Sequence, residues 1–414
     1  MFDDVTSTFS NSNHIFYSSS NENPIKPSEI TLETPLDHLY LSWTEKELPE
    51  HERTKHVHRL HPYLGKYVPQ LVEIFLRKFF KPGETILDPF AGSGTTLVQA
   101  NELGMHGIGY DVSAFNIILM RAKTAHYNVK EVEKEVKDIL LKVEKVTQHP
   151  YQRPYQNDMF ETFSPRKVAE PGNDYLQRWF APQALQELLV FRSLIKNYQY
   201  QDLLKIILSR SARSARLTTH FDLDMPKAPQ TEPYHCYKHK RICQPTTTAF
   251  QFLRRYGLDT ITRIKEHARL QTDTKVEIYH QDSSTASIPI IDGVVTSPPY
   301  VGLINYHEQH RYAYELLELE DRRAEEIGSA QAGTSKKAKK EYQDKIVQVF
   351  QNISGSMRSG GYFIVVAGDK HNLYDEIAKM LDVTVEAVVQ RHVNRRTGRR
   401  ATEFYESVFI WRKK

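Results

Sequence analysis

The chain has 414 residues, enough for one large α/β domain with a second module and a sizeable core. It is 40% hydrophobic and 26% charged, and its formal charge of +4 does not by itself indicate a nucleic-acid partner. Two cysteines argue against a disulfide framework. No apolar run is long enough to span a membrane, and the polar N-terminus lacks the pattern of a signal peptide, so we expect a cytoplasmic protein with no membrane partner.

The first part of the chain predicts the opening of a doubly wound sheet. Residues 66–80 carry apolar side chains at helical spacing. A short strand at 85–87 leads through a glycine-rich turn into a helix that ends near 103, and a second strand occupies 107–110. Strand, turn, helix and strand in this order are typical of doubly wound α/β folds.

The middle of the chain, roughly 125–275, is mostly helical in pattern, with a Pro-rich break at 149–172 and a polar, irregular stretch at 218–248. The α/β pattern then resumes, with a helix at 340–357 and strands at 276–280, 293–296, 362–367 and 407–411. We therefore expect a mostly parallel, Rossmann-like sheet with a largely helical inserted module. The expected divisions are an N-terminal arm (1–50), two parts of the sheet domain (51–125 and 275–414) and the inserted module (126–274).

The segment from Asp88 to Thr96 follows the first strand and opens a helix. Gly92 and Gly94 allow tight turns and close approach of a ligand, and the helix start supplies free N–H groups. Asp88, at the strand end, can bind an ammonium group. The turn has no P-loop lysine, which disfavours phosphate. Asp111 follows the second strand about twenty residues later, where an acidic residue can hydrogen-bond ribose hydroxyls. Each feature alone is also compatible with plain packing, whereas the pair indicates a cofactor site.

A second motif, Thr296-Ser-Pro-Pro-Tyr300, follows the strand at 293–296. Its two prolines fix the backbone and remove two N–H donors, which leaves carbonyl groups as acceptors in a rigid turn. Ser297 adds a hydroxyl and Tyr300 an aromatic face on which a base taken out of a duplex can stack. Acceptors placed here can bind both hydrogens of an exocyclic amine and direct its lone pair at an electrophilic methyl group.

Together these residues resemble the amino-methyltransferase family of DNA-modifying enzymes. Asp88-Pro-Phe-Ala-Gly-Ser-Gly-Thr-Thr96 is similar to the family's cofactor motif. Thr296-Ser-Pro-Pro-Tyr300 is similar to its catalytic motif in the form usual for N4-cytosine enzymes, whereas adenine-N6 enzymes more often have Asp or Asn at the position of Ser297. His61 to Lys66, His280 to Ser283 and Gly360-Gly-Tyr362 resemble flanking motifs, and the resemblance covers about 58–125 and 275–411.

The resemblance implies S-adenosylmethionine as the cofactor and assigns roles to the matching residues. Asp111 should hold the ribose and Asp282 the adenine. The other expected cofactor contacts are His61, Tyr63, Lys66, Asp88, Pro89, Phe90, Gly92, Gly94, Thr95 and Ser283. The expected catalytic residues, which hold the target base, are Ser297, Pro298, Pro299 and Tyr300.

Three basic runs suggest contacts to DNA, because their alternation with small polar residues suits phosphates and base edges. The alternative for each run is a solvated charged surface. The long insertion also departs from the family's usual layouts, which place the recognition region elsewhere. The expected DNA contacts are Arg210, Arg213, Arg216, Lys238, Lys240, Arg241, Arg395, Arg396, Arg399 and Arg400.

The segment His235-Cys236-x-x-His239-x-x-x-Cys243 contains four possible zinc ligands. Its spacing does not match the common finger patterns, and the adjacent His235 and Cys236 cannot easily bind one ion. We therefore interpret it as a packed recognition loop and expect no metal, with a metal site as the alternative. A C5-methyltransferase nucleophile at Cys243 is rejected, because that family's cysteine follows a proline and Ile242 precedes this one.

The resulting hypothesis is a site-specific enzyme that methylates N4 of cytosine in double-stranded DNA by base flipping. Such an enzyme would associate with the nucleoid in a bacterium and could belong to a restriction-modification system, with a nuclease that acts on the same site as its partner. The alternatives are adenine-N6 transfer on the same scaffold, an RNA amino-methyltransferase, and a non-catalytic DNA-binding relative.

Overall fold

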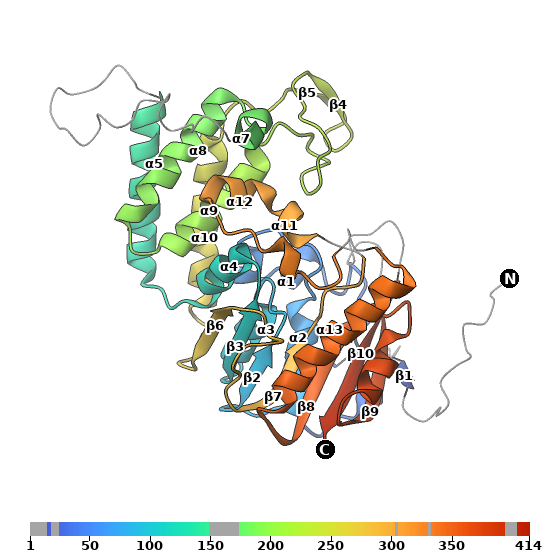
Figure 1. The fold of residues 1–414 in the computed structure, drawn as a ribbon. Helices are drawn as coiled ribbons and strands as arrows, with labels where there is room; N and C mark the ends of the chain where they lie inside the picture. The colour runs from blue at the N-terminus through green and yellow to red at the C-terminus, as the bar shows by residue number, and fades with distance from the viewer. Residues whose placement is uncertain (1–14, 18–24, 149–173, 303–304, 330–332, 394–403) are drawn as a thin grey trace.

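The computed structural model describes residues 15–17, 25–148, 174–302, 305–329, 333–393 and 404–414. A sheet-based body and a helical lobe above it make up the molecule (Figure 1). No helix within these ranges is both long and apolar enough to cross a membrane.

Within the described residues, eight strands form the main sheet in the order β1-β9-β10-β8-β7-β2-β3-β6. Of these strands, β10 alone runs antiparallel to its neighbours, and the other pairs are parallel. This confirms the doubly wound, mostly parallel sheet, although β1 and β9 had no counterpart among the predicted strands. The strands are β1 (Ile15–Tyr17), β2 (Thr85–Asp88), β3 (His106–Asp111), β6 (Val276–His280), β7 (Ile291–Thr296), β8 (Met357–Ala367), β9 (Val383–Val393) and β10 (Phe404–Lys413).

The chain's connections reverse direction between β2 and β7, which lie side by side in the middle of the sheet. In open α/β sheets ligands bind outside the carboxyl ends of the strands at such a switch point. Here those ends carry Asp88 on β2 and Thr296 on β7, the first residues of the two predicted motifs. The topology alone therefore brings the two motifs together.

Helices cover both faces of the sheet. On one face α13 (Lys336–Ser354) and α14 (Leu373–Lys379) bury Phe350 and Tyr374 against the strands, and Figure 1 shows α13 crossing in front of the sheet. On the other face α2 (Pro69–Phe79) packs through Phe75 together with the segment 30–48, whose Leu41 and Trp43 are buried. The described part of the expected N-terminal arm is thus a strap packed on the sheet, with α1 at Glu50–Arg53.

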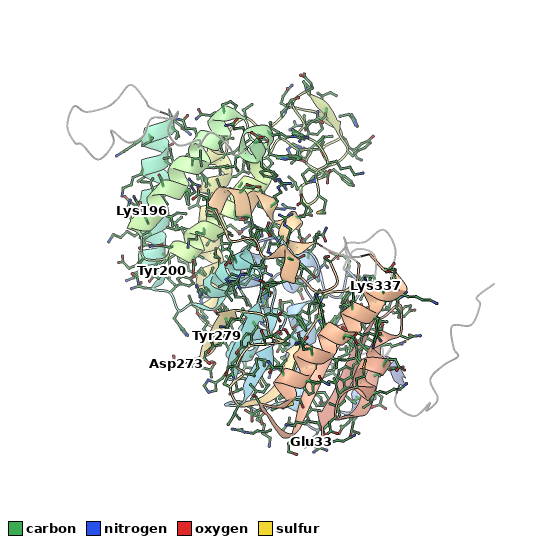
Figure 2. The ribbon with its side chains drawn as sticks, viewed as in Figure 1. Glu33, Lys196, Tyr200, Asp273, Tyr279 and Lys337 are labelled. Carbon is green, nitrogen blue, oxygen red and sulfur yellow. The ribbon has the colours of Figure 1, made fainter. Side chains whose placement is uncertain are left out.

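Two further helices connect the sheet to the lobe. They are α3 (Thr95–Glu102) and α4 (Ala114–Thr124), and α4 contacts both β6 and α9. At this edge Tyr279 of β6 stacks on Tyr110 of β3, with ring centroids 4.9 Å apart. Figure 2 shows Tyr279 and Asp273 at the sheet edge below Tyr200 of the lobe.

The lobe is largely helical, as the periodicity of the middle segment predicted. It contains α5 (Val129–Gln148), α7 (Asp174–Trp179), α8 (Pro182–Leu194), α9 (Gln201–Ala215) and α10 (Phe250–His267). A two-stranded hairpin of β4 (Tyr234–Cys236) and β5 (Arg241–Cys243) lies between α9 and α10 in the sequence and projects from one side of the lobe (Figure 1).

Two helices that follow the catalytic motif also belong to the lobe by their packing. They are α11 (Tyr306–Gln309) and α12 (Arg311–Leu317), and Tyr312 and Leu316 of α12 share a hydrophobic core with α9. The same core contains Val57 and Leu60, from the chain that precedes the first motif. The lobe therefore packs on chain segments from both sides of the insertion, and this holds it against the mouth of the central crevice.

Candidate active site

The glycine-rich turn after β2 is shaped by two glycines with left-handed backbone. Gly92 has φ +49° and Gly94 φ +75°. The Gly92 N–H donates to the carboxylate of Asp111 at 2.8 Å, which ties the turn to the end of β3. A Cβ on Gly94 would lie 2.9 Å from Cγ of Met120 on α4, so this glycine is required for close packing of the turn on a helix. Gly94 is absent from the wall of the cavity at the carboxyl ends of β2, β3 and β7. This differs from its expected role as a cofactor contact.

A cavity of about 820 Å³, its open mouth included, lies at the carboxyl ends of β2, β3 and β7. Residues from both predicted motifs line it. Those expected to hold the cofactor are Tyr63, Lys66, Pro89, Phe90, Gly92, Thr95, Asp111, Asp282 and Ser283, and those expected to hold the target base are Ser297 and Pro299. The structure thus brings these eleven residues, more than 200 positions apart at the extremes, around one space.

Asp111 is held in place by three donors. It accepts hydrogen bonds from the backbone N–H groups of Gly92 and Ser113, both at 2.8 Å, and from the Asn116 side chain at 3.1 Å. Burial raises the pKa of the Asp111 carboxyl, and the three hydrogen bonds oppose that rise. Asn116 also donates to the Tyr63 hydroxyl at 3.1 Å, so the predicted ribose contact and an aromatic wall residue form one rigid unit.

Asp88 lies deeper than the sequence suggested. It is 1% exposed and accepts hydrogen bonds from Thr296 at 2.6 Å, Thr96 at 2.7 Å, and Tyr67 and the Phe90 N–H at 3.2 Å. Four donors occupy the acceptor positions of one carboxylate, and Asp88 is absent from the cavity wall. The arrangement therefore does not support the expected direct contact with an ammonium group, and instead makes Asp88 a link between the two motifs.

His61 is likewise structural in this arrangement. It is fully buried, Nδ1 lies 2.8 Å from the Pro62 carbonyl oxygen, and Nε2 lies 3.0 Å from the Ser209 hydroxyl of α9. Burial lowers the pKa of His61 well below its usual value, so the ring is neutral. It joins the segment before the first motif to the lobe, and it does not line the cofactor cavity. Lys66 does line that cavity, and its ammonium group donates to the His58 carbonyl oxygen at 2.7 Å.

The catalytic motif is braced by an ion pair that the sequence did not reveal. The Tyr300 hydroxyl donates to Glu406 of β10 at 2.9 Å, and Glu406 receives two hydrogen bonds from Arg391 of β9, at 2.9 and 2.6 Å. Arg391 is 6% exposed and Glu406 8%. The Tyr300 ring packs on Gly368, where a Cβ would lie 3.0 Å from the ring. Burial raises the pKa of Tyr300 well above its usual value, with the Glu406 carboxylate as the next cause, so the hydroxyl stays protonated.

Within the motif the remaining residues divide by position. Ser297 and Pro299 face the cavity, whereas Pro298 is buried behind it. Ser297 also shares a hydrogen bond with Tyr300. The serine is therefore the polar side chain of the motif that both reaches the cofactor space and is oriented by the braced tyrosine.

The cavity wall also carries acidic groups that sequence reasoning missed. Glu325, Glu326 and Tyr306 line the cavity together with Asp111. Glu326 is 8% exposed on its side chain and accepts from the backbone N–H of His307 at 3.0 Å. Glu325 and Glu326 lie in a charged segment that had no motif to mark it. A wall of carboxylates suits a ligand that carries positive charge. S-adenosylmethionine carries such charge at its sulfonium and ammonium groups, so these acidic side chains fit this cofactor.

The predicted DNA contacts fall into three sets. Lys238, Lys240 and Arg241 are exposed on the β4–β5 hairpin. Arg395, Arg396, Arg399 and Arg400 lie outside the described residues.

The third set, Arg210, Arg213 and Arg216 on and after α9, contacts internal partners, which differs from the expected role of these residues as DNA contacts. Arg210 and Arg216 are 9% and 3% exposed. Arg210 pairs with Asp259 at 2.6 Å, and Arg213 donates to Asp224 at 3.1 Å. The guanidinium of Arg216 stacks over Tyr312, 4.4 Å from the ring centroid.

The sheet order, the switch-point cavity and its wall define a Rossmann-like, S-adenosylmethionine-dependent methyltransferase. Residues 8–121 match the family model described as DNA methylase. The Type II methyltransferase M.MjaII of Methanocaldococcus jannaschii is 37% identical over 430 residues, covering 87% of this chain and 81% of that protein. M.BsoBI of Geobacillus stearothermophilus is 24% identical over 306 residues, covering 67% of this chain and 56% of that protein.

The chain therefore belongs to the N6/N4 family of DNA amino-methyltransferases. Among solved structures, TrmN from Thermus thermophilus gives a TM-score of 0.31 at 10% identity, covering 84% of this chain and 50% of that one, a similarity too low to add to the sheet topology. The family includes enzymes that act on either base, so membership does not decide between cytosine and adenine.

Proposed function

We propose that this enzyme transfers a methyl group to N4 of cytosine in duplex DNA. The observation that carries the proposal is the position of Ser297, a small neutral side chain on the wall of the cofactor cavity. Its neighbour Pro299 lines the same space, and Tyr300 is braced beside it by Glu406. The motif resembles the cytosine-specific form of the family, in which serine stands where adenine enzymes more often have Asp or Asn.

The proposed mechanism uses this chain's residues mainly to position the base. When bound, the cofactor supplies an electrophilic methyl group. A cytosine rotated out of the duplex stacks on Tyr300, while Ser297 and the backbone carbonyls around Pro298 accept the two hydrogens of its exocyclic amine. This draws the nitrogen lone pair out of conjugation with the ring. N4 gains the methyl group, the electron pair of the broken S–CH3 bond would remain on the cofactor's sulfur, and the proton that N4 loses passes to solvent. Alignment of the reacting atoms provides most of the rate acceleration.

A basic groove next to the cofactor cavity supports the approach of DNA. The two share Tyr63, Gly65, Lys66 and Tyr67 as common walls. Of the cationic side chains that line the groove, Arg53, Arg210 and Arg213 pair with internal carboxylates, which leaves Arg59, Lys66 and Lys238 beside Glu50. Arg59 and Lys238 are exposed, and Arg59 was not among the predicted contacts. A duplex in this groove would lie beside the cavity, so that a base rotated out of the stack reaches Ser297.

The product of the reaction tests the proposal directly. DNA methylated by the purified enzyme is digested to nucleosides and analysed by mass spectrometry, with an RNA of the same sequence as a second substrate. We expect N4-methylcytosine in the DNA. N6-methyladenine in the DNA would overturn the base assignment, and methylation of the RNA alone would overturn the DNA substrate.

The role of Ser297 is tested by Ser297→Ala. Loss of a contact made in the transition state should reduce turnover by about 10²–10³ while calorimetry shows unchanged affinity for S-adenosylmethionine. Unchanged turnover would contradict the role. The matched control is Ser284→Ala, near the cavity wall but absent from it, which should retain activity.

A restriction nuclease that acts on the same site is the partner we propose, in line with the Type II relatives. Plasmid DNA methylated by the enzyme should resist digestion by such a nuclease from the source organism. Equal cleavage of methylated and unmethylated plasmid would contradict this pairing.

A further inference from the structure

Four potential metal ligands converge at the β4–β5 hairpin. They are His220, Cys236, His239 and Cys243, and their ligand atoms all lie within 4.8 Å of one another. Both cysteines are free thiols and nearly buried, at 2% and 7% exposure. His220 comes from the loop after α9, outside the spacing that the sequence motif covers.

The distances between these atoms match a shared tetrahedral ion. Cys236 Sγ lies 3.6 Å from His220 Nδ1, and His239 Nδ1 lies 3.4 Å from Cys243 Sγ. Zinc binds sulfur at about 2.3 Å and imidazole nitrogen at about 2.0–2.1 Å. At the tetrahedral angle these bond lengths place sulfur and nitrogen about 3.5–3.6 Å apart. The protein alone therefore already holds two sulfur–nitrogen edges of the coordination polyhedron.

The hairpin register explains which residues take part. Tyr234 lies opposite Cys243, and Cys236 opposite Arg241, so both cysteines lie on one face of the ribbon. His235 is paired with Ile242 on the other face and is exposed. Lys240 has φ +53° and its N–H donates to the Cys236 carbonyl oxygen at 2.7 Å, which closes the turn that carries His239.

We propose that His220, Cys236, His239 and Cys243 form a structural zinc site. Two sulfurs and two imidazoles make a closed set of four protein ligands, the pattern of structural rather than catalytic zinc. Binding releases the thiol protons and forms two Zn–S and two Zn–N bonds. The Tyr234 hydroxyl lies 2.8 Å from Nδ1 of His220, and ligation through that nitrogen replaces this contact. The proposal replaces the sequence-based expectation of a metal-free loop.

The site accounts for how an otherwise weakly cored segment keeps its shape. Between α9 and α10 the chain exposes Phe221 and Tyr237, each 80% accessible, and Ile242 at 60%. Few apolar side chains are left to hold the hairpin, and a bound ion supplies the missing cross-link. Lys238, which lines the basic groove, lies beside the ligand His239. The ion would thereby fix a cationic side chain at the groove. This consequence rests on the proposed function, but the zinc site itself does not rest on it.

Metal analysis of the full-length protein, purified without chelator, is the first test. We expect about one zinc per chain. Cys236→Ser and Cys243→Ser should each reduce the bound zinc at least tenfold, whereas His235→Ala, on the opposite face of the same hairpin, should keep it. Absence of stoichiometric zinc from the wild type, or equal loss from His235→Ala, would overturn the site.

Two measurements on the protein without substitutions test the site even if the variants fail to fold. After exchange with cobalt, a sulfur-to-cobalt charge-transfer band should appear with the visible bands of tetrahedral cobalt. The other His and carboxylate cluster among the described residues (His56, His58 and Glu102) has no sulfur, so this band reports on the hairpin alone. A six-coordinate spectrum without the charge-transfer band would overturn the proposal.

Thiol titration gives an independent result because the chain has only two cysteines. Alkylation of Cys236 and Cys243 should be slow in the zinc-bound protein and at least tenfold faster after a chelator is added. A rate that does not respond to chelator, or recovery of a disulfide between the two residues, would contradict zinc ligation. None of these readouts depends on methyl transfer, so they remain informative if the proposed base specificity is wrong.

Discussion

The hydroxyl of Thr296 donates a 2.6 Å hydrogen bond to the carboxylate of Asp88, which joins the last residue of β7 to the last residue of β2. These two residues begin the catalytic and cofactor motifs, and they are 208 positions apart in the sequence. The bond is buried, since Asp88 is 1% and Thr296 0% exposed. The carboxylate of Asp88 thus holds the base-binding turn and the cofactor turn in fixed positions relative to one another.

Removing that donor should weaken the fold. Thr296→Val keeps the side-chain shape but leaves the buried carboxylate with one hydrogen bond fewer, so we expect the free energy of unfolding to fall by about 1–3 kcal/mol. Urea denaturation at neutral pH measures it. Thr262→Val, at an exposed position on α10, is the matched control and should stay within about 0.5 kcal/mol of wild type. Equal effects of the two substitutions would contradict a special role for the Asp88–Thr296 bond.

The ionisation of Asp88 should make stability depend on pH. Burial raises its pKa from 3.8 to about 6, against the hydrogen bonds from Thr296 and Thr96. A carboxyl whose pKa is higher in the folded state contributes stability that is complete below about pH 4 and is lost as the pH rises through 6.

Asp88→Asn removes this titration and leaves every other group in place. The free energy of unfolding of the wild type, minus that of Asp88→Asn, should therefore fall by on the order of 3 kcal/mol between pH 4 and pH 7. Urea denaturation of both proteins across this range tests the expectation. A difference that stays constant with pH would show that Asp88 has an ordinary pKa.

Tyr300 should act mainly through its ring. Tyr300→Phe loses the hydrogen bond to Glu406, but Glu406 keeps its pair with Arg391, so turnover should fall by no more than about tenfold. Tyr300→Ala also loses the stacking surface, worth about 1–3 kcal/mol, and should fall further, by up to about 150-fold. Steady-state kinetics on a duplex substrate distinguishes the two. If the Phe and Ala variants were equally impaired, the hydroxyl rather than the ring would be the essential group.

The hairpin lysines should contribute directly to DNA affinity. Lys238→Ala and Lys240→Ala should each weaken binding and reduce the slope of log K against log salt by about 1. Lys196→Ala is the matched control, because it removes the same charge from an exposed position on the side of the lobe opposite the hairpin (Figure 2). Fluorescence anisotropy over a range of salt concentrations gives both quantities. An unchanged salt slope in the two hairpin variants would remove them from the interface.

Arg216→Ala should behave in the opposite way. This guanidinium is buried against Tyr312 and donates to the Leu223 carbonyl oxygen, so its loss should destabilise the lobe. The folded fraction should bind DNA with the wild-type salt slope. A lower slope with unchanged stability would restore Arg216 to the interface that the sequence predicted.

Local pattern was sufficient for several features of this protein. Glycine spacing, a strand before it and an acidic residue after the next strand predicted the cofactor turn, because short-range sterics determine a strand-to-helix turn. The Ser-Pro-Pro-Tyr segment was recognisable for the same reason, since proline fixes its own backbone. Apolar periodicity likewise predicted most strands of the sheet and the helical character of the lobe.

Long-range packing decided the rest. The motif placed Asp88 correctly at the end of a strand. The fold alone shows that Thr296, Thr96 and Tyr67 donate to its carboxylate, which lies behind the cavity wall. Arg210 lay in a run that was predicted to contact DNA, and the fold pairs it with Asp259. Residues far apart in the sequence supply these partners, so no local pattern could reveal them.

Long-range packing also explains why the observed metal cluster differs from the predicted one. The sequence by itself grouped His235, Cys236, His239 and Cys243 by proximity along the chain, and the alternation of a β-ribbon points His235 away from the cysteines. The tertiary structure brings His220 from the preceding loop to the place that His235 could not fill. Sequence determined the chemistry available on each segment, and the folded chain decided which of those groups meet.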